Sequence, residues 1–242
     1  YPENTFIAFY KAKEMEADWI ELDVHATKDG KMIIMHDSSL KRTTGLKKKI
    51  WQVTYEEIKD LDADILFGEE FKGEKIPLLE DVLKWAKANK IKLNIEMKPS
   101  GYETDFELSV VNLIKKYDLE EDCAITSQVY ELLKTVKQLD NKIKTGYIMP
   151  FAFGDFISLE DIDLFSVELT NVNQTMVDAI HKRGKKLHVW TVNTREDIEK
   201  MMDLEVDNII TDDVDLAKQL IEEKREKNVI EETIIWIENL LS

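Results

Sequence analysis

Two carboxylates and an imidazole lie close together early in the chain, at Glu21, Asp23 and His36. Glu21 and Asp23 are two positions apart, so in an extended segment both point to one face, about 7 Å apart. Asp29-Gly30 separates them from a second apolar-rich run ending in His36, and Asp-Gly in that setting is a strong hairpin signal. A two-residue turn there predicts Asp23 opposite His36, with Cβ atoms about 5 Å apart. The pattern indicates a metal site beside an acid–base group; the alternative is an ordinary hairpin with a solvated polar face.

A later segment, residues 93–98, alternates strictly between apolar and polar side chains. Its polar face carries Asn94, Glu96 and Lys98. In an antiparallel sheet with one solvated face this alternation would be unremarkable. It becomes informative only if the fold buries both faces of the strand, so the fold has to be established first.

Composition describes a globular chain of about one α/β barrel in size, with 242 residues, 43% hydrophobic and 34% charged. The net charge of −16 argues against a nucleic-acid-binding surface. Cys123 is the only cysteine, which excludes multi-thiolate metal sites within one chain and favours a small core residue. No apolar run approaches the length of a membrane span. The start at Tyr1 shows neither a signal peptide nor an initiator Met, and suggests a fragment or a processed product.

From residue 79 onward helical and extended patterns alternate, which predicts βα units and a parallel sheet. Strands are expected at 20–24, 32–36 (the hairpin arm), 92–98, 124–127, 145–149, 164–168, 187–192 and 208–211. Residues 38–77 form an insertion with too few apolar residues for its own core. Seven parallel strands predict an α/β fold of the TIM (β/α)₈ barrel type that lacks its first strand. We expect the barrel to span 1–224, followed by a helical tail over 225–242.

In such a barrel the inner face is sealed from bulk water, and active groups sit at the carboxyl ends of the strands. Glu21, Asp23 and Glu96 all fall towards those ends. Gathering three carboxylates there without a cation would be costly, because like charges repel strongly in a low dielectric. An all-oxygen ligand set suits Mg²⁺ or Ca²⁺. The barrel therefore favours the metal site over the solvated face.

These residues, taken with others in chain order, resemble the glycerophosphodiester phosphodiesterase family over nearly the whole chain, to about residue 224. The matching motifs are Pro2-Glu3-Asn4-Thr5, Ile20-Glu21-Leu22-Asp23-Val24, Thr27-Lys28-Asp29-Gly30, His36-Asp37, Arg42-Thr43-Thr44, Ile76-Pro77 with Leu79-Glu80, Asn94-Ile95-Glu96-Met97-Lys98, Trp190-Thr191-Val192-Asn193 and Ile210-Thr211-Asp212. Each motif alone is weak, but nine in register are highly specific.

The resemblance implies a barrel of the phospholipase C-like phosphodiesterase type that hydrolyses glycerophosphodiesters to glycerol 3-phosphate and an alcohol. It implies one divalent cation, Mg²⁺ or Ca²⁺, bound by Glu21, Asp23 and Glu96, with His36 as the general acid that protonates the leaving alkoxide. It also implies substrate contacts, and these are Lys98, Trp190 and Glu3. The expected partner is a small-molecule glycerophosphodiester, and no nucleic acid.

The family carries a second histidine in a His-Arg-Gly motif on the first strand, upstream of Pro2, and this sequence begins after it. His25, expected at the mouth of the hairpin beyond the strand end, His181 on an outer helix and His188 on a strand are better interpreted as structural or surface residues. Loss of a positioned acid or base typically costs 10²–10⁴-fold in rate. The chain as it stands is therefore expected to be impaired.

Two alternatives remain open: a catalytically inactive barrel that acts as a binding module, and a phospholipase D-type enzyme that acts on lysolipids. Residues 144–149 are similar to the C-terminal catalytic domain of membrane-anchored bacterial members. That similarity implies an upstream membrane-anchoring domain and hence membrane association, with a cytoplasmic location as the alternative. The oligomeric state, the substrate head group and the role of the tail are not indicated.

Overall fold

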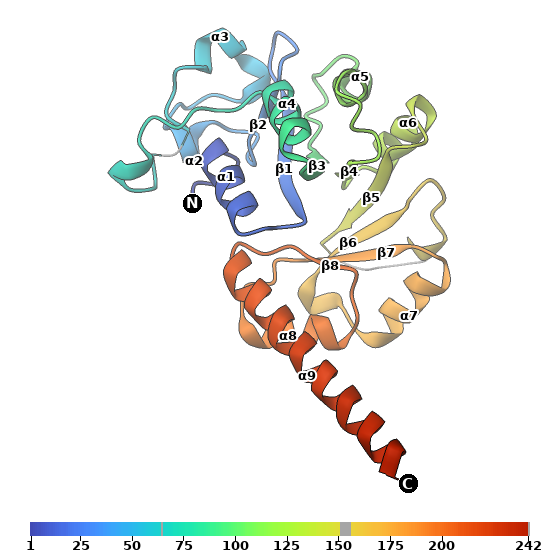
Figure 1. Ribbon diagram of the computed structural model, residues 1–242. Coiled ribbons are helices and arrows are strands. Elements are labelled where there is room, and N and C mark those ends of the chain that lie inside the picture. Colours follow the sequence, from blue (N-terminus) through green and yellow to red (C-terminus); the bar gives the residue numbers. More distant parts are fainter. Residues whose placement is uncertain (64, 151–155, 242) are drawn as a thin grey trace. The chain divides into compact units, whose positions relative to one another are not determined.

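The computed structural model describes residues 1–63, 65–150 and 156–241. The chain divides into two compact units. Figure 1 labels their helices and strands. The first comprises Tyr1–Met149 and Ser158–Ser166, and the second comprises Pro150–Ile157 and Val167–Ser242. Strand β6 (Leu164–Glu168) begins in the first unit and ends in the second. The short helix η3 (Phe156–Ser158) is also divided, with Phe156 and Ile157 in the second unit and Ser158 in the first.

The first unit contains most of the strands and helices. In chain order its elements are α1 (Phe6–Glu14), β1 (Trp19–Ala26), β2 (Met32–Ile34), α2 (Lys41–Thr44), η1 (Ile50–Gln52), α3 (Tyr55–Ile58), η2 (Glu69–Phe71), α4 (Leu79–Asn89), β3 (Lys92–Met97), α5 (Phe106–Lys116), β4 (Cys123–Ser127), α6 (Tyr130–Leu139) and β5 (Lys144–Met149). The second unit adds η4 (Leu169–Asn171), α7 (Gln174–Lys182), β7 (Lys186–Trp190), α8 (Arg195–Asp203), β8 (Asn208–Ile209) and α9 (Val214–Leu241).

Each segment expected as a strand is a strand, with bounds that differ by a few residues. In the first unit the strand order is β2-β1-β3-β4-β5. Strand β2 is antiparallel to β1, and the pairs β1–β3, β3–β4 and β4–β5 are parallel. In the second unit β7 and β8 are parallel. The predicted βα alternation and its parallel pairing are confirmed for these pairs.

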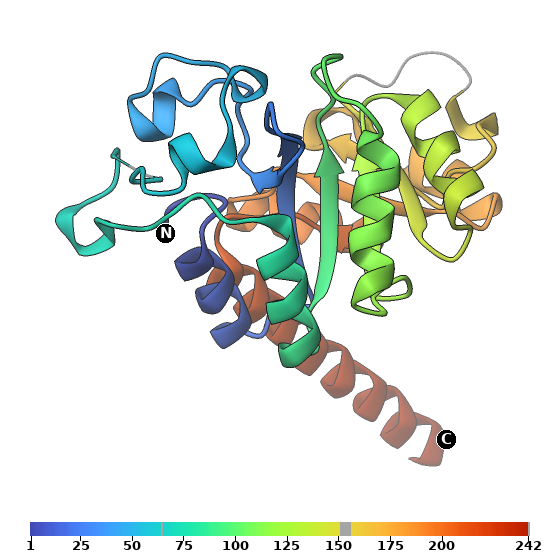
Figure 2. The same ribbon diagram turned by 90° about the horizontal axis from the view of Figure 1, so that it is seen from above.

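Both faces of β1 are buried, as expected for a parallel strand covered by helices. Leu22 and Val24 are fully buried on one face, and Asp23 and His25 are almost fully buried on the other. Helix α4 contacts α5, α5 contacts α6, and α6 packs against β4 and β5. Figure 2 shows α4 and α5 beside β3. On the polar face of β3, Asn94 is buried, and the side chains of Glu96 and Lys98 are only 14% and 19% exposed.

The hairpin register differs from the prediction. Ala26 pairs with Met32 and Val24 with Ile34, so Asp23 comes opposite Met35, whose N–H donates to the Asp23 carbonyl at 2.9 Å. The loop holds three residues instead of two. Its last residue, Gly30, has a φ of +73°, as in hairpins closed by a turn followed by a left-handed glycine.

A one-residue slip exchanges the two faces of a strand. The predicted position of His36 opposite Asp23 is therefore wrong. The side chain of Asp29 helps to fix the longer loop, because its carboxylate accepts hydrogen bonds from the Thr27 hydroxyl at 2.6 Å and from the Tyr55 N–H at 3.0 Å. Tyr55 belongs to the insertion, and the hairpin prediction considered only the two arms and the turn between them.

The insertion over residues 38–77 packs around a hydrophobic cluster that it shares with the hairpin. The buried members are Ile33, Met35, Leu40, Ile50, Val53, Ile58, Ala63 and Ile76. Two of them, Ile33 and Met35, come from the hairpin arm. The insertion thus has more buried apolar residues than expected, but it still completes its core with the hairpin arm.

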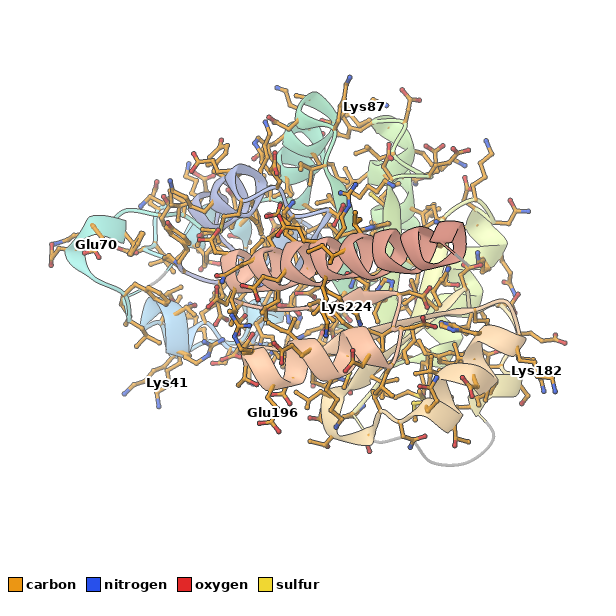
Figure 3. The ribbon with its side chains drawn as sticks, turned by 60° about the horizontal axis from the view of Figure 1, so that its bottom comes forward. Lys41, Glu70, Lys87, Lys182, Glu196 and Lys224 are labelled. Atoms are coloured by element: carbon orange, nitrogen blue, oxygen red, sulfur yellow. The ribbon has the colours of Figure 1, made fainter. Side chains whose placement is uncertain are left out.

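Before β1, the described residues of the first unit form helix α1 and no strand. At the other end, α9 continues without a break from Val214 to Leu241, past the expected boundary at residue 224. No helix among the described residues has the length and apolar character needed to cross a bilayer. Charged side chains of both signs lie on the helices, among them Lys87 on α4 and Glu196 on α8 in Figure 3.

Candidate metal centre

Three carboxylates from two adjacent strands converge on one point in the first unit. Glu21 and Asp23 lie on β1 and Glu96 on β3, and one oxygen from each lies within 4.8 Å of the others. The parallel register places Asp23 beside Glu96 and Glu21 beside Asn94. Paired residues on parallel strands point to the same face, so this register is what gathers the carboxylates. The Asn94 amide is itself held by a 3.0 Å hydrogen bond from the Thr126 hydroxyl.

Burial makes this cluster electrostatically strained. It raises the pKa of Glu96 to about 7, chiefly because a buried carboxylate loses hydration; the neighbouring Lys98 ammonium opposes the shift and Asp23 adds to it. Carboxylate oxygens at this spacing are the ligand set that Mg²⁺ and Ca²⁺ prefer. The donor set therefore fits a hard divalent cation, which would favour the ionised form of Glu96.

Lys98 supplies a positive charge to the cluster. Its Nζ lies 2.8 Å from an Asp23 carboxylate oxygen and 3.8 Å from a Glu96 oxygen. Its backbone N–H donates to the Val24 carbonyl at 3.1 Å, which continues the β1–β3 ladder one residue past β3. The ammonium also donates to the His36 carbonyl at 3.4 Å. Lys98 thus contacts both carboxylate strands and the backbone of the proposed acid.

Asn4 is a part of the site for which the sequence reasoning gave no role. Its Nδ2 donates to an Asp23 carboxylate oxygen at 2.8 Å, and its Oδ1 accepts from the Asp23 N–H at 3.1 Å. Asn4 has a φ of 57°, a left-handed conformation that asparagine adopts more readily than most residues. The signal in the sequence was an asparagine just ahead of a helix, which more commonly indicates a cap.

His36 lies just beyond β2, and its side chain is 57% exposed. Its Nδ1 is 2.9 Å from an Asp37 carboxylate oxygen, to which it donates. Arg42 donates to both oxygens of Asp37, at 2.8 and 3.1 Å. The Arg42 guanidinium holds the pKa of the Asp37 carboxyl at about 2, against a smaller opposing effect of burial. Asp37 is therefore ionised and oriented throughout the neutral range.

Glu3, expected to contact substrate, pairs with the other side of Arg42. Arg42 Nη1 donates to Glu3 Oε2 at 2.9 Å and Nη2 donates to Oε1. This contact joins residues 39 positions apart in the chain. The expectation that Glu3 binds substrate stays a prediction, but the structure shows a protein partner for both of its oxygens.

His25 lies inside β1 and is almost fully buried, so its predicted place beyond the strand end is wrong. His25 pairs with Ile33 and Ala26 with Met32, so the ladder with β2 continues past Val24 and includes His25. Its Nε2 donates to the His36 carbonyl at 3.3 Å. Burial lowers the pKa of His25 below its usual value. This neutral ring supports the backbone of His36.

Trp190, at the end of β7, belongs to the second unit and is not among the residues that the first unit brings together. Its indole N–H is buried and has no hydrogen-bond partner among the described residues. The other two histidines are also in this unit. His181 on α7 bonds Asp207 at 2.8 Å, and His188 lies buried in the middle of β7.

The fold and the acidic site define an α/β chain of the TIM-barrel type, and comparison with known proteins agrees. The chain is 38% identical over 226 residues to a glycerophosphodiester phosphodiesterase of Caldanaerobacter subterraneus subsp. tengcongensis, covering 91% of this chain and 92% of that one. Among solved structures it resembles an Oleispira antarctica phosphodiesterase in complex with the product sn-glycerol-3-phosphate. The identity is 26% and the TM-score 0.85, with 91% and 92% of the two chains covered.

The chain also shares its fold with a glycerophosphoryl diester phosphodiesterase structure from Silicibacter pomeroyi that bears the name putative. The identity is 21% and the TM-score 0.83, with 92% of this chain and 89% of that one covered. The family model for the glycerophosphoryl diester phosphodiesterase family matches residues 1–216. The chain belongs to this family. It is thus a phosphoric diester hydrolase by class, as its motifs indicated.

Proposed function

We propose that this chain hydrolyses glycerophosphodiesters to glycerol 3-phosphate and an alcohol, with one divalent cation held by Glu21, Asp23 and Glu96. The observation that carries the proposal is the convergence of these carboxylates on one point within the enclosed face of the sheet. The product bound to the Oleispira antarctica relative supports the substrate class. We further propose Mg²⁺ or Ca²⁺ as the cation, because every donor is a carboxylate oxygen.

A bound cation would supply Lewis-acid polarisation of the phosphoryl oxygens. Lys98 then has a second role. Its ammonium balances the carboxylates through Asp23, and we propose that it also contacts the phosphate of the substrate. Trp190 is proposed to line the substrate pocket, and Glu3 to lie near it.

His36 is proposed to hold a proton at Nε2 while Nδ1–H donates to Asp37. As the bond between phosphorus and the alcohol oxygen breaks, the Nε2 proton passes to the leaving alkoxide. Water supplies the oxygen that replaces it on phosphorus and returns a proton to the ring. Such a positioned acid contributes about 10²–10⁴-fold to the rate.

The test is release of glycerol 3-phosphate from glycerophosphocholine by the full natural chain, with Mg²⁺ or Ca²⁺ and after chelation. Glu96→Gln and His36→Ala should each lower turnover at least about 100-fold. Glu131→Gln is the matched control, because Glu131 is an exposed carboxylate paired with Lys134 on α6.

Turnover that is insensitive to chelation would reject the metal assignment. A chain that binds the cation but releases nothing from glycerophosphocholine would next be tested on lysolipids, for the phospholipase D-type reaction, and then as a binding module. The upstream membrane anchor and the location it implies stay predictions, as does the division between barrel and tail at residue 224.

A further inference from the structure

Four side chains form an unbroken line of charge-assisted hydrogen bonds that ends on His36. Glu3 accepts from Arg42, Arg42 donates to Asp37, and Asp37 accepts from the His36 Nδ1–H. The participants come from three places in the chain: the segment ahead of α1, the end of the hairpin and helix α2. Only tertiary folding brings them together.

The line contributes little to stability by itself. The side chains of Arg42, Glu3 and Asp37 are 39%, 43% and 31% exposed. Ion pairs of such exposure contribute little to stability, because solvent screens them and ordering long side chains costs entropy. Their distinguishing consequence is geometric. Arg42 engages both oxygens of Asp37, which fixes the plane of that carboxylate.

A fixed Asp37 determines which ring nitrogen of His36 keeps its proton. A carboxylate can only accept, so the bonded Nδ1 must carry hydrogen, and Nε2 is left to exchange a proton with a substrate. The side chain of His36 is more than half exposed, so few other contacts restrict rotation of the ring. Loosening Asp37 would therefore release both the tautomer and the orientation of the acid.

We propose that Glu3 and Arg42 are positioning residues that hold Asp37 against His36, so that Nε2 of His36 is the proton donor. The inference rests on the proposed role of His36 as general acid. It assigns Glu3 a role through Arg42 instead of a direct contact with substrate.

Two substrates separate this role from a general structural one. Glycerophosphocholine releases an alkoxide that needs a proton, whereas a glycerol phosphodiester of 4-nitrophenol releases a phenolate that is stable without one. We expect Glu3→Gln and Arg42→Lys to lower kcat on the choline ester about tenfold, with KM little changed and a smaller loss on the aryl ester. Lysine cannot make the planar two-pronged contact of arginine, so Arg42→Lys should not rescue the line.

The chain offers a matched control on α8. Arg195 Nη1 also lies between two carboxylates, those of Glu199 and Glu223, each at 3.1 Å, and none of these residues belongs to the line that ends on His36. Glu223→Gln should leave the ratio of the two substrates unchanged. In the His36→Ala background, Glu3→Gln should add no further loss on the choline ester, because residues that act through one group are not additive.

Equal losses on both substrates, a raised KM at unchanged kcat, or additive losses with His36→Ala would each overturn the proposal. A measurement that needs no turnover tests the same proposal even if the proposed function fails. The ¹⁵N shifts of the neutral His36 ring, assigned by their absence in His36→Ala, report the tautomer. Glu3→Gln should raise the Nε2–H population. An unchanged tautomer in Glu3→Gln overturns the proposal. If the protein releases no glycerol 3-phosphate, or if His36→Ala lowers turnover of the two esters equally, only the assignment of His36 as general acid is rejected.

Discussion

Asn4 and Asp23 exchange two hydrogen bonds, from the Asn4 amide to the Asp23 carboxylate at 2.8 Å and from the Asp23 N–H to the Asn4 carbonyl oxygen at 3.1 Å. The segment ahead of α1 is thereby attached directly to the central carboxylate of the candidate metal centre. One Asp23 oxygen is occupied by this amide and the other by Lys98. Asn4 therefore orients Asp23, one of the three carboxylates that would bind the cation.

Asn4→Ala is expected to weaken divalent cation binding about 10–100-fold, because residues that orient metal ligands typically contribute that much. Isothermal titration with Mg²⁺ and with Ca²⁺ measures the change. Asn193→Ala is a closely matched control. Asn193, in the second unit, donates to the Asp212 carboxylate at 2.7 Å and accepts from the Asp212 N–H at 2.9 Å, and Asp212 is not one of the three carboxylates. Equal weakening in both variants would contradict a specific role for Asn4.

The raised pKa of Glu96 predicts how the metal-free protein responds to pH. The value of about 7 in the folded chain lies above the ordinary 4.5, so between these pH values the folded chain keeps a proton that the unfolded chain has lost. The free energy of unfolding should therefore fall as pH rises from about 4.5 to about 7. Urea unfolding in the presence of a chelator, at several pH values, measures this slope.

Glu96→Gln should remove that part of the slope, because the amide does not titrate. Cation affinity should show the opposite trend and rise with pH over the same interval, since binding requires the ionised carboxylate. A variant with the slope of the parent chain would show that another group carries the titration.

Adding the cation should stabilise the fold. At 100 times its dissociation constant, a ligand that binds only the folded state adds about 2.7 kcal/mol. For a chain of this size we expect an increase in Tm of about 5–10 °C. Thermal unfolding with and without Ca²⁺ or Mg²⁺ checks this. Glu21→Gln and Asp23→Asn should reduce the increase and Glu131→Gln should preserve it; an increase that survives in Asp23→Asn would place the cation elsewhere.

Two glycines are expected to resist substitution for different reasons. At Gly146 in β5, an added Cβ would lie 2.3 Å from Leu164 Cδ1 and 2.6 Å from Thr126 Cγ2. Gly146→Ala should therefore cost about 1–3 kcal/mol through overpacking. At Gly30 nothing lies within 4 Å and only the φ of +73° is strained, so Gly30→Ala should cost about 1 kcal/mol. Denaturant unfolding compares them, and a larger loss at Gly30 would contradict the argument.

Much of the fold was readable from local patterns. The alternation of helical and extended segments predicted each strand, because apolar periodicity and turn residues are properties of short stretches. The carboxylates of Glu21 and Asp23 could be assigned to one face from their spacing, and Glu96 to the polar face of its own strand. Such statements need only the geometry of a single extended segment.

The contacts between segments could not be obtained in this way. The hairpin register was mispredicted because Asp29 is held by Tyr55 of the insertion, and one additional loop residue moves His36 away from Asp23. The carboxylates meet instead through the parallel register of β1 and β3.

The sequence by itself determined which residue types occupy the enclosed faces of the strands, because alternation along one strand is a local property. Only the tertiary structure decided their partners: Asn4 on Asp23, Lys98 between the strands, and Arg42 between Glu3 and Asp37. The physical reason is that each of these contacts joins segments whose separation along the chain carries no information about distance in space. Register, loop length and packing set that distance, and they depend on the whole fold at once.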